Sequence, residues 1–341
     1  MTIADELQLT IEQMVQRGKG ILAADESLPT IAKRFSAINV ESTEEHRRAY
    51  RALLFGAPGI EAYISGVIAF EETLGQTSED GEPLPEVLAR RGIVPGIKVD
   101  RGKGPLALSP GDEITYGLDG LAERLQRYKE QGARFAKWRE VYSIGERNPS
   151  PLGIAANAEM LARYAAVCQA QGIVPIVEPE VLIDGDHDLA RCAEVTEAVQ
   201  KEIFHALHRH HVVLEHILLK PNMVLPGKGH PLKAGPEEVA AATLRVLRRT
   251  VPAAVPSINF LSGGLGPEEA TANLNAMNAG SPASPWLLSF SYGRALQQPV
   301  LQAWQGRPGN RAAAQQALLK RARLNGAAQR GEYRPEMESS D

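Results

Sequence analysis

The sequence predicts an α/β protein, a single (β/α)8 TIM barrel that takes in residues 1–341. Eight short apolar runs recur along the chain, centred near residues 22, 66, 97, 136, 176, 218, 260 and 289. Helical patterns separate most of these runs, and this alternation is typical of βαβ units in a parallel sheet. Eight such units in about 300 residues fit one closed barrel better than a doubly wound sheet.

The elements are expected in a simple order. A helix over residues 3–17 precedes the first run and ends at a glycine stop. The runs are continuously apolar, so their strands should be covered on both faces. A polar excursion, 76–91, follows the second strand. We expect a barrel core over about 18–305, helices over 118–131, 155–171, 188–208 and 236–250, a last helix over 311–324 and a mobile polar tail over 326–341.

The composition limits the class of function. With 43% hydrophobic residues, 23% charged residues and a net charge of −4, the chain fits a soluble globular protein without a nucleic-acid partner. No apolar run is long enough to span a bilayer, and residues 1–6 do not resemble a signal peptide. The two cysteines, Cys168 and Cys192, are expected to be reduced thiols. We therefore expect a cytoplasmic protein without a membrane partner.

One residue of the sixth apolar stretch, 214–224, has to be explained first. Lys220 lies there among residues that are almost all apolar, and lysine is rarely buried without a partner or a purpose. Its stem could be buried while its head reaches solvent at the strand end. Alternatively, burial could favour the neutral amine, which is a nucleophile toward carbonyls.

The other strand ends favour the second interpretation. In such a barrel, the carboxyl ends of the strands form one mouth, where active sites lie. Seven of the eight predicted strands deliver charged or hydrogen-bonding groups there, whereas structural charges would scatter over the helix exteriors. These groups are Asp25, Glu26, Lys98, Asp100, Lys137, Arg139, Glu178, Glu180, Lys220, Ser262, Gly263, Tyr292 and Arg294.

The arrangement predicts Schiff-base chemistry on a ketone or an aldehyde. Lys137 and Lys220 come from the fourth and sixth strands, which place inward side chains in the same layer. A neighbouring cation favours the neutral form of Lys220 through like-charge repulsion. Asp25 and Glu178 supply an acid and a base in the same pocket.

Two anion sites are predicted at this mouth. The loops after the seventh and eighth strands expose backbone N–H groups and an arginine fork, where many barrels hold a phosphate. Across the mouth, Ser27, Lys33, Arg34 and Lys98 could form a second basic site. The predicted substrate therefore carries two phosphates that flank a carbonyl.

With these motifs the chain resembles the class I fructose-1,6-bisphosphate aldolases, the Schiff-base family. The resemblance covers about residues 15–305 and rests on segments 20–27, 96–100, 135–139, 175–180, 213–224, 260–264 and 289–296. It implies reversible cleavage of fructose 1,6-bisphosphate to dihydroxyacetone phosphate and glyceraldehyde 3-phosphate in glycolysis or gluconeogenesis. It further implies that no metal or cofactor is needed, and that the protein forms a homo-oligomer, commonly a tetramer.

The resemblance also implies roles for individual residues. Lys220 would form the Schiff base, and Glu178 would move protons as the carbinolamine forms and loses water. Asp25 would lie beside the reacting C–C bond, with Lys137 as its electrostatic partner. The implied substrate-binding residues are Arg139 and Glu180 in the pocket, Ser262, Gly263, Gly293 and Arg294 at one phosphate, and Ser27, Arg34 and Lys98 toward the other.

The chain departs from the family pattern at three places, one of which is Leu265, often a glutamine in relatives. Pro29 lies where relatives typically have glycine, and it stiffens the loop and removes a hydrogen-bond donor near the second phosphate. The tail lacks the terminal tyrosine that relatives use in proton transfer at the enamine, and Tyr333 is the nearest tyrosine. Slower enamine turnover is expected unless another group serves.

Three alternatives stay open at the level of sequence. The histidines of 205–211, with His216, could indicate a zinc-dependent aldolase, although a solvated helix end explains them more simply. A Schiff-base enzyme could instead carry out a transaldolase-like transfer, or prefer sedoheptulose bisphosphate. The chain could also be a non-catalytic scaffold that keeps the fold.

Overall fold

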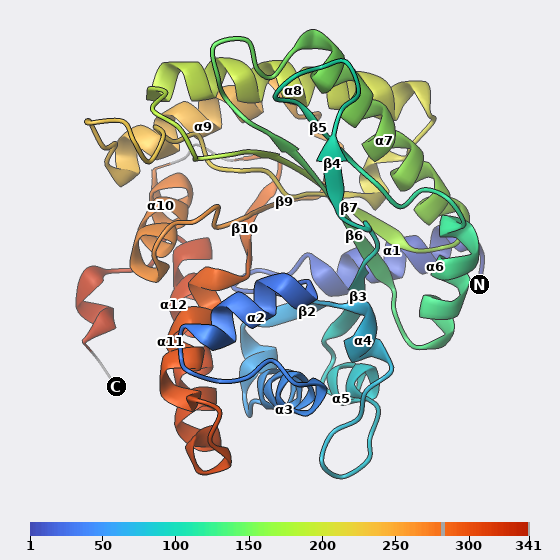
Figure 1. Cartoon of the computed structure of the whole chain (residues 1–341), viewed down its shortest axis with the longest axis vertical. Helices are drawn as coiled ribbons and strands as arrows, with labels where there is room; N and C mark the ends of the chain where they lie inside the picture. The colour runs from blue at the N-terminus through green and yellow to red at the C-terminus, as the bar shows by residue number, and fades with distance from the viewer. Residues whose placement is uncertain (281–283, 340–341) are drawn as a thin grey trace.

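A computed structural model describes residues 1–280 and 284–339. In those residues, eight parallel strands close into a barrel in the order β1-β10-β9-β8-β7-β6-β3-β2, which confirms the predicted fold (Figure 1). The barrel strands are β1 Gly20–Ala24, β2 Ile64–Ala69, β3 Val94–Lys98, β6 Phe135–Tyr142, β7 Val174–Val181, β8 Leu218–Leu219, β9 Ser257–Phe260 and β10 Leu287–Tyr292. A small antiparallel pair, β4 Lys103–Pro105 and β5 Glu113–Thr115, forms a separate sheet.

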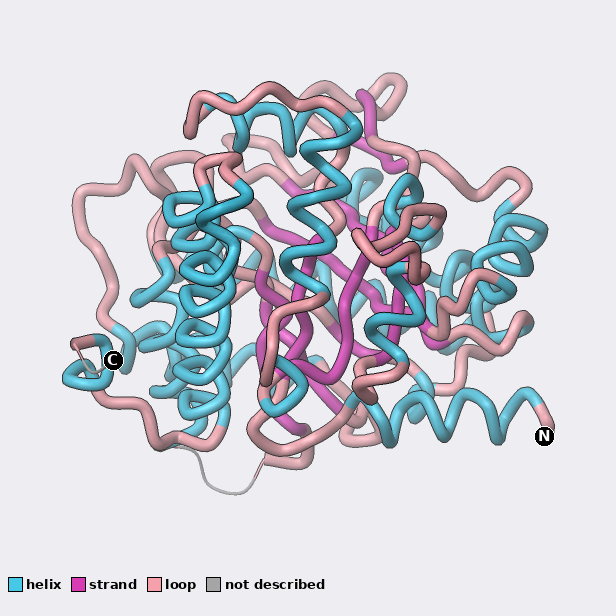
Figure 2. Tube along the Cα trace, turned by 90° about the horizontal axis from the view of Figure 1, so that it is seen from below, coloured by secondary structure: helices cyan, strands magenta, loops and turns pink. Residues whose placement is uncertain are grey.

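Helices surround the strands (Figure 2). They are α1 Ile3–Met14, α2 Leu28–Ser36, α3 Glu44–Phe55, α4 Glu71–Leu74, α5 Leu84–Ala89, α6 Leu121–Glu130, α7 Pro151–Ala170, α8 Leu189–Arg209, α9 Pro236–Thr250, α10 Pro267–Ala279, α11 Arg294–Trp304 and α12 Arg311–Gln329. Short 3-10 helices span Ile60–Ala62, Leu214–His216, Pro308–Asn310 and Pro335–Glu338. No helix in the described part of the chain is long and apolar enough to cross a membrane.

The interior of the barrel is packed at its amino end. Strand residues such as Ile68, Phe135 and Ile176 fill it, and Ile11 and Met14 of α1 pack against them from outside. The strand glycines make room for this core, because a Cβ at Gly96 would lie 2.2 Å from the Phe135 ring. Polar chemistry is therefore confined to the carboxyl ends of the strands.

The stretch around Lys220 is less regular than predicted. Residues 214–224 do not form one strand: a 3-10 helix spans Leu214–His216, and β8 covers only Leu218–Leu219. The backbone N–H of Lys220 still donates to the Val177 carbonyl at 2.8 Å. Pro221 has no N–H to donate, but its carbonyl still accepts from the Leu261 N–H at 3.0 Å.

The predicted last helix, 311–324, is longer in the structure, and part of the predicted mobile tail is packed against it. Helix α12 continues to Gln329, and Tyr333 is only 8% exposed. Arg321 holds the segment through two hydrogen bonds of 2.6 Å to Glu338, which also accepts one from the Tyr333 hydroxyl at 3.0 Å. A buried ring and ion pair thus anchor this segment; residues 340–341 lie outside the described part.

Candidate active site

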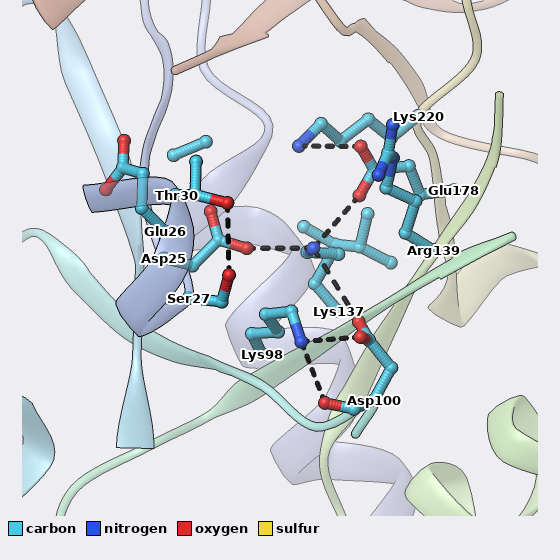
Figure 3. Close-up of polar contacts among 12 residues, drawn as sticks. Asp25, Glu26, Ser27, Thr30, Lys98, Asp100, Lys137, Arg139, Glu178 and Lys220 are labelled. Carbon is cyan, nitrogen blue, oxygen red and sulfur yellow. Dashed lines mark hydrogen bonds and ion pairs between the residues drawn. The ribbon is translucent and has the colours of Figure 1, made fainter. Parts of the chain in front are cut away.

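The predicted catalytic residues come together at the carboxyl ends of the strands (Figure 3). Asp25 follows β1, and Lys220 follows β8. Lys137 and Arg139 lie two residues apart on β6, as do Glu178 and Glu180 on β7, so each pair projects to the same face of its strand. The interpretation of Lys220 as a lysine that reaches solvent was wrong, since it is 3% exposed.

Lys137 is the centre of an ion-pair cluster. Its Nζ lies 2.8 Å from Asp25 Oδ2, 3.3 Å from Glu178 Oε2 and 3.8 Å from Asp100 Oδ2. Burial by itself would lower the pKa of Lys137, but the three carboxylates outweigh it and raise the pKa above its usual range. Lys137 is therefore a permanent cation at neutral pH.

Asp25 is held in its charged form. Burial would raise its pKa, but the positive charges of Lys137, Lys220 and Lys98 outweigh this effect and hold the pKa of Asp25 well below its usual range. The side chain is nevertheless mostly buried, with 12% of its surface exposed. The site thus contains a carboxylate whose ionisation depends on neighbouring cations.

Glu178 lies between the two lysines. Its Oε1 is 3.2 Å from the Lys220 Nζ, while its Oε2 faces Lys137. Figure 3 shows this carboxylate linking the lysines, so they do not contact each other directly. A carboxyl group at this distance from a buried amine can exchange protons with groups bound to that amine.

The first predicted anion site lies at the loops after β9 and β10. Gly263 and Gly264 have φ angles of 50° and 97°, which glycine adopts without strain. Arg294 donates to the Gly264 carbonyl and thereby joins the two loops. Lys228 is an additional cation here, with its Nζ 3.2 Å from where a Cβ on Gly264 would lie.

Two further predicted residues flank this first site. The Arg34 Nη2 lies 3.7 Å from where a Cβ on Gly293 would be, so Arg34 is next to the β10 loop. Arg139 forms an ion pair with Glu180, whose Oε1 is 3.9 Å from the corresponding position at Gly263. Arg34 is therefore placed beside the first anion site, although the sequence had assigned it to the opposite one.

The second predicted anion site is a cavity of about 590 Å³ beside the catalytic cluster. Ser27, Thr30, Lys98, Arg101 and Arg139 are among its lining residues. The Ser27 and Thr30 hydroxyls are 3.0 Å apart, and Lys98 donates to Asp100. Lys33 does not line this cavity, and Pro29 forms part of its wall.

A cavity of similar volume, about 610 Å³, lies at the amino ends of β3 and β6. Its lining includes Gln76, Glu86 and Arg134 but none of the predicted site residues. Active sites of such barrels lie at the opposite ends of the strands. Of these two cavities, only the one that Ser27 and Lys98 line contains predicted site residues.

Comparison with known proteins decides the family. Residues 6–341 match the family model of class-I fructose-bisphosphate aldolase. The chain belongs to the class I fructose-bisphosphate aldolase family. This membership confirms the predicted activity, aldol cleavage of fructose bisphosphate by a lyase of the metal-independent class, and it rules out the zinc-dependent alternative.

Similar proteins occur in distant organisms. The chain is 56% identical to the non-muscle fructose-bisphosphate aldolase of Lethenteron camtschaticum, covering 97% of this chain and 91% of that protein. It is 55% identical to the cytoplasmic isozyme of Spinacia oleracea over 97% of this chain and 92% of that one. The Plasmodium falciparum aldolase, solved with TRAP and an inhibitor, superimposes with a TM-score of 0.96 at 50% identity, covering 97% and 96% of the two chains.

The histidines that suggested a metal site have other surroundings. The His210 Nε2 lies 2.6 Å from Glu159 Oε1 at the end of α8. Among residues 1–280 and 284–339, no group of three or more metal-ligating side chains is placed to hold an ion. These histidines lie outside the aldolase site.

Lys228 was not predicted from the sequence, and Asp100 was placed at the mouth without being given a role. Asp100 contacts both Lys98 and Lys137, and its strand-end position was a signal for this role. Lys228 comes from a loop after β8 whose path no sequence pattern predicts. The Tyr333 hydroxyl points to Glu338 on the segment after α12, so Tyr333 is engaged away from the Lys220 cluster.

Proposed function

We propose that this aldolase cleaves fructose 1,6-bisphosphate through a Schiff base on Lys220. The observation that best supports this mechanism is that the Lys220 amine is buried and lies 3.2 Å from the Glu178 carboxylate, which also faces Lys137. Once Glu178 has taken a proton from this amine, its nitrogen can attack the C2 carbonyl, and Glu178 can then return the proton needed to expel water. The resulting iminium withdraws electrons from the neighbouring carbon–carbon bond.

Asp25 is suited to the cleavage step. As a carboxylate it can take the C4 hydroxyl proton, whereupon the C3–C4 bond breaks and its electron pair enters the iminium to give an enamine. Glyceraldehyde 3-phosphate leaves, and protonation and hydrolysis of the enamine release dihydroxyacetone phosphate. The fixed charge of Lys137 stabilises the carboxylates and the developing alkoxide throughout.

The binding residues are assigned in the same proposal. Ser262, Gly263, Gly293 and Arg294 would hold one phosphate, with Arg34 and Lys228 adding positive charge beside it. Ser27, Thr30 and Lys98 would hold the other. We further propose a cytoplasmic homo-oligomer that acts in glycolysis or gluconeogenesis, with small sugar phosphates and no nucleic acid or membrane as partners.

A substrate comparison tests this function. The purified chain should cleave fructose 1,6-bisphosphate with a higher kcat/KM than sedoheptulose 1,7-bisphosphate, and EDTA should leave the rate unchanged. A higher kcat/KM for the longer sugar would change the assigned substrate. Inhibition by EDTA would contradict the metal-free mechanism, and absence of cleavage of either sugar would favour the scaffold alternative.

A further inference from the structure

A buried polar cluster lies directly behind the turn that carries Asp25. It consists of Glu26 after β1, Tyr50 and Arg51 on α3, and Gln297 on α11. Their exposed fractions are 7%, 0%, 2% and 0%, respectively. All four residues are buried, and the cluster contacts the site through the groups that it holds.

The side-chain amide of Gln297 forms hydrogen bonds with three partners. Its Nε2 donates to the Ala23 carbonyl at 2.7 Å and to Glu26 Oε1 at 2.7 Å. Its Oε1 accepts a hydrogen bond from the Tyr50 hydroxyl at 3.1 Å. The Ala23 carbonyl and the Glu26 carboxylate can only accept, so both N–H groups point to the β1 turn and the amide oxygen is left to accept from Tyr50.

Tyr50 is itself fixed by aromatic packing. Its ring centroid lies 5.5 Å from that of Phe35 on α2 and 5.1 Å from that of Trp304 on α11. These contacts join α2, α3 and α11 behind the mouth. The orientation of the Gln297 amide is therefore set by a rigid part of the core.

The partners of Gln297 flank the catalytic carboxylate. Ala23 and Glu26 stand on either side of the Ala24–Asp25 pair, and Figure 3 shows Glu26 next to Asp25. The backbone N–H of Gln297 also donates to the Gly293 carbonyl at 3.0 Å, in the first turn after the β10 loop. Gln297 thus connects the turn of Asp25, through its side chain, with the anion loop of Gly293 and Arg294, through its backbone.

Glu26 extends the connection to Arg34. It forms ion pairs with Arg34 through Oε1 and, at 2.7 Å, with the buried Arg51 through Oε2. Arg51 compensates the Glu26 charge from the core side, while Arg34 keeps 20% of its side chain exposed beside Gly293. The same carboxylate is therefore held by Gln297 and Arg51 and in turn orients Arg34.

We propose that Gln297 is a positioning residue that holds the Asp25 turn and Arg34 in register with the phosphate loop after β10. This inference rests on the proposed function, because it assigns Asp25 to bond cleavage and Arg34 to phosphate binding. It concerns cleavage geometry, because the Gln297 side chain bonds to the β1 turn and to Tyr50, whereas Lys220 is paired with Glu178.

The first test compares Gln297→Met with the wild type. Methionine fills similar space but donates no hydrogen bond to Ala23 or Glu26. We expect kcat for cleavage to fall about 10- to 100-fold, because a misplacement of about 1 Å can cost about 100-fold. Borohydride trapping of dihydroxyacetone phosphate on Lys220 should remain near the wild-type yield, since this reaction breaks no C–C bond.

Gln200→Met is the matched control. Gln200 on α8 is 1% exposed and accepts a hydrogen bond from Thr250, away from the barrel mouth. It should lose stability but keep the wild-type kcat per folded molecule. If Gln297→Met keeps its kcat, or loses cleavage and trapping in equal proportion, the proposal is overturned.

A second variant supplies a pH readout. In Gln297→Glu the new carboxyl faces the Ala23 carbonyl and Glu26, two acceptors, so only its protonated form can restore a donor. The other titratable groups around it are Arg34, Arg51 and Tyr50, and burial raises the pKa of Tyr50 above its usual range, so the phenol stays neutral.

The ratio of kcat in Gln297→Glu to kcat in Gln297→Met should therefore rise as the pH falls. A ratio that does not change with pH would contradict the positioning role.

The activity of the wild type distinguishes the failure of this inference from the failure of the proposed function. A wild type that fails to cleave the sugar refutes the proposed function. An active wild type with an unaffected Gln297→Met refutes only this inference.

Discussion

Replacing Lys220 with methionine should reduce cleavage of fructose 1,6-bisphosphate by roughly 10⁴- to 10⁶-fold, the scale on which the loss of a catalytic nucleophile acts. Methionine fits the buried site but cannot form an iminium, so the electrons of the C3–C4 bond have no acceptor. The fold should survive, because Glu178 keeps its ion pair with Lys137 at 3.3 Å. The measurement is kcat per folded molecule, with folding followed by circular dichroism.

A surface lysine provides the control for this variant. Lys201 on α8 is 57% exposed at its side chain and pairs with Glu197 at 2.5 Å, so Lys201→Met should keep full activity. Cleavage by Lys220→Met at a few per cent of the wild-type rate would show that Lys220 is not the covalent residue.

Replacing Lys137 with methionine should have the second largest effect. We expect kcat to fall about 10²- to 10³-fold, the range observed when one preorganised electrostatic group is removed. The loss has two causes: the developing alkoxide loses a cation, and Asp25, Glu178 and Asp100 lose their shared partner. Stability should also fall, because unpaired charges remain buried.

The pH profile of Lys137→Met distinguishes electrostatics from simple misfolding. In the wild type, Lys137 is the strongest of the cations that hold the pKa of Asp25 low against the effect of burial. Without Lys137, less positive charge opposes the effect of burial, so the pKa of Asp25 must rise. The acidic limb of the kcat profile should then move to higher pH, so that activity is lost earlier on acidification. An unchanged acidic limb would contradict the assignment of Asp25.

Much of this site follows from the sequence because a parallel barrel converts strand order into position. Once the strands were recognised, Asp25, Lys137, Glu178 and Lys220 had to share one mouth. The glycines and Arg294 after the last two strands could be placed for the same reason. What the strand pattern supplies is the end of the barrel at which each side chain lies.

The features that could not be predicted depend on contacts between elements. The placement of Glu178 between two lysines depends on side-chain rotamers, and Arg34 reaches Gly293 from a helix whose packing no local pattern encodes. In the sequence, nothing distinguishes Gln297 from the other polar residues of its helix. Tyr333 falls in the predicted mobile tail. Its hydroxyl donates to Glu338, which is held by Arg321 of another element, and no local pattern predicts that contact.

Reduction with borohydride in the presence of dihydroxyacetone phosphate, followed by peptide mapping, tests the central claim most directly. Borohydride reduces an iminium to a stable secondary amine and so marks the lysine that formed it. We expect a single adduct, on Lys220, and none in Lys220→Met. An adduct on Lys137 or another lysine, or no adduct in the wild type, would contradict the mechanism.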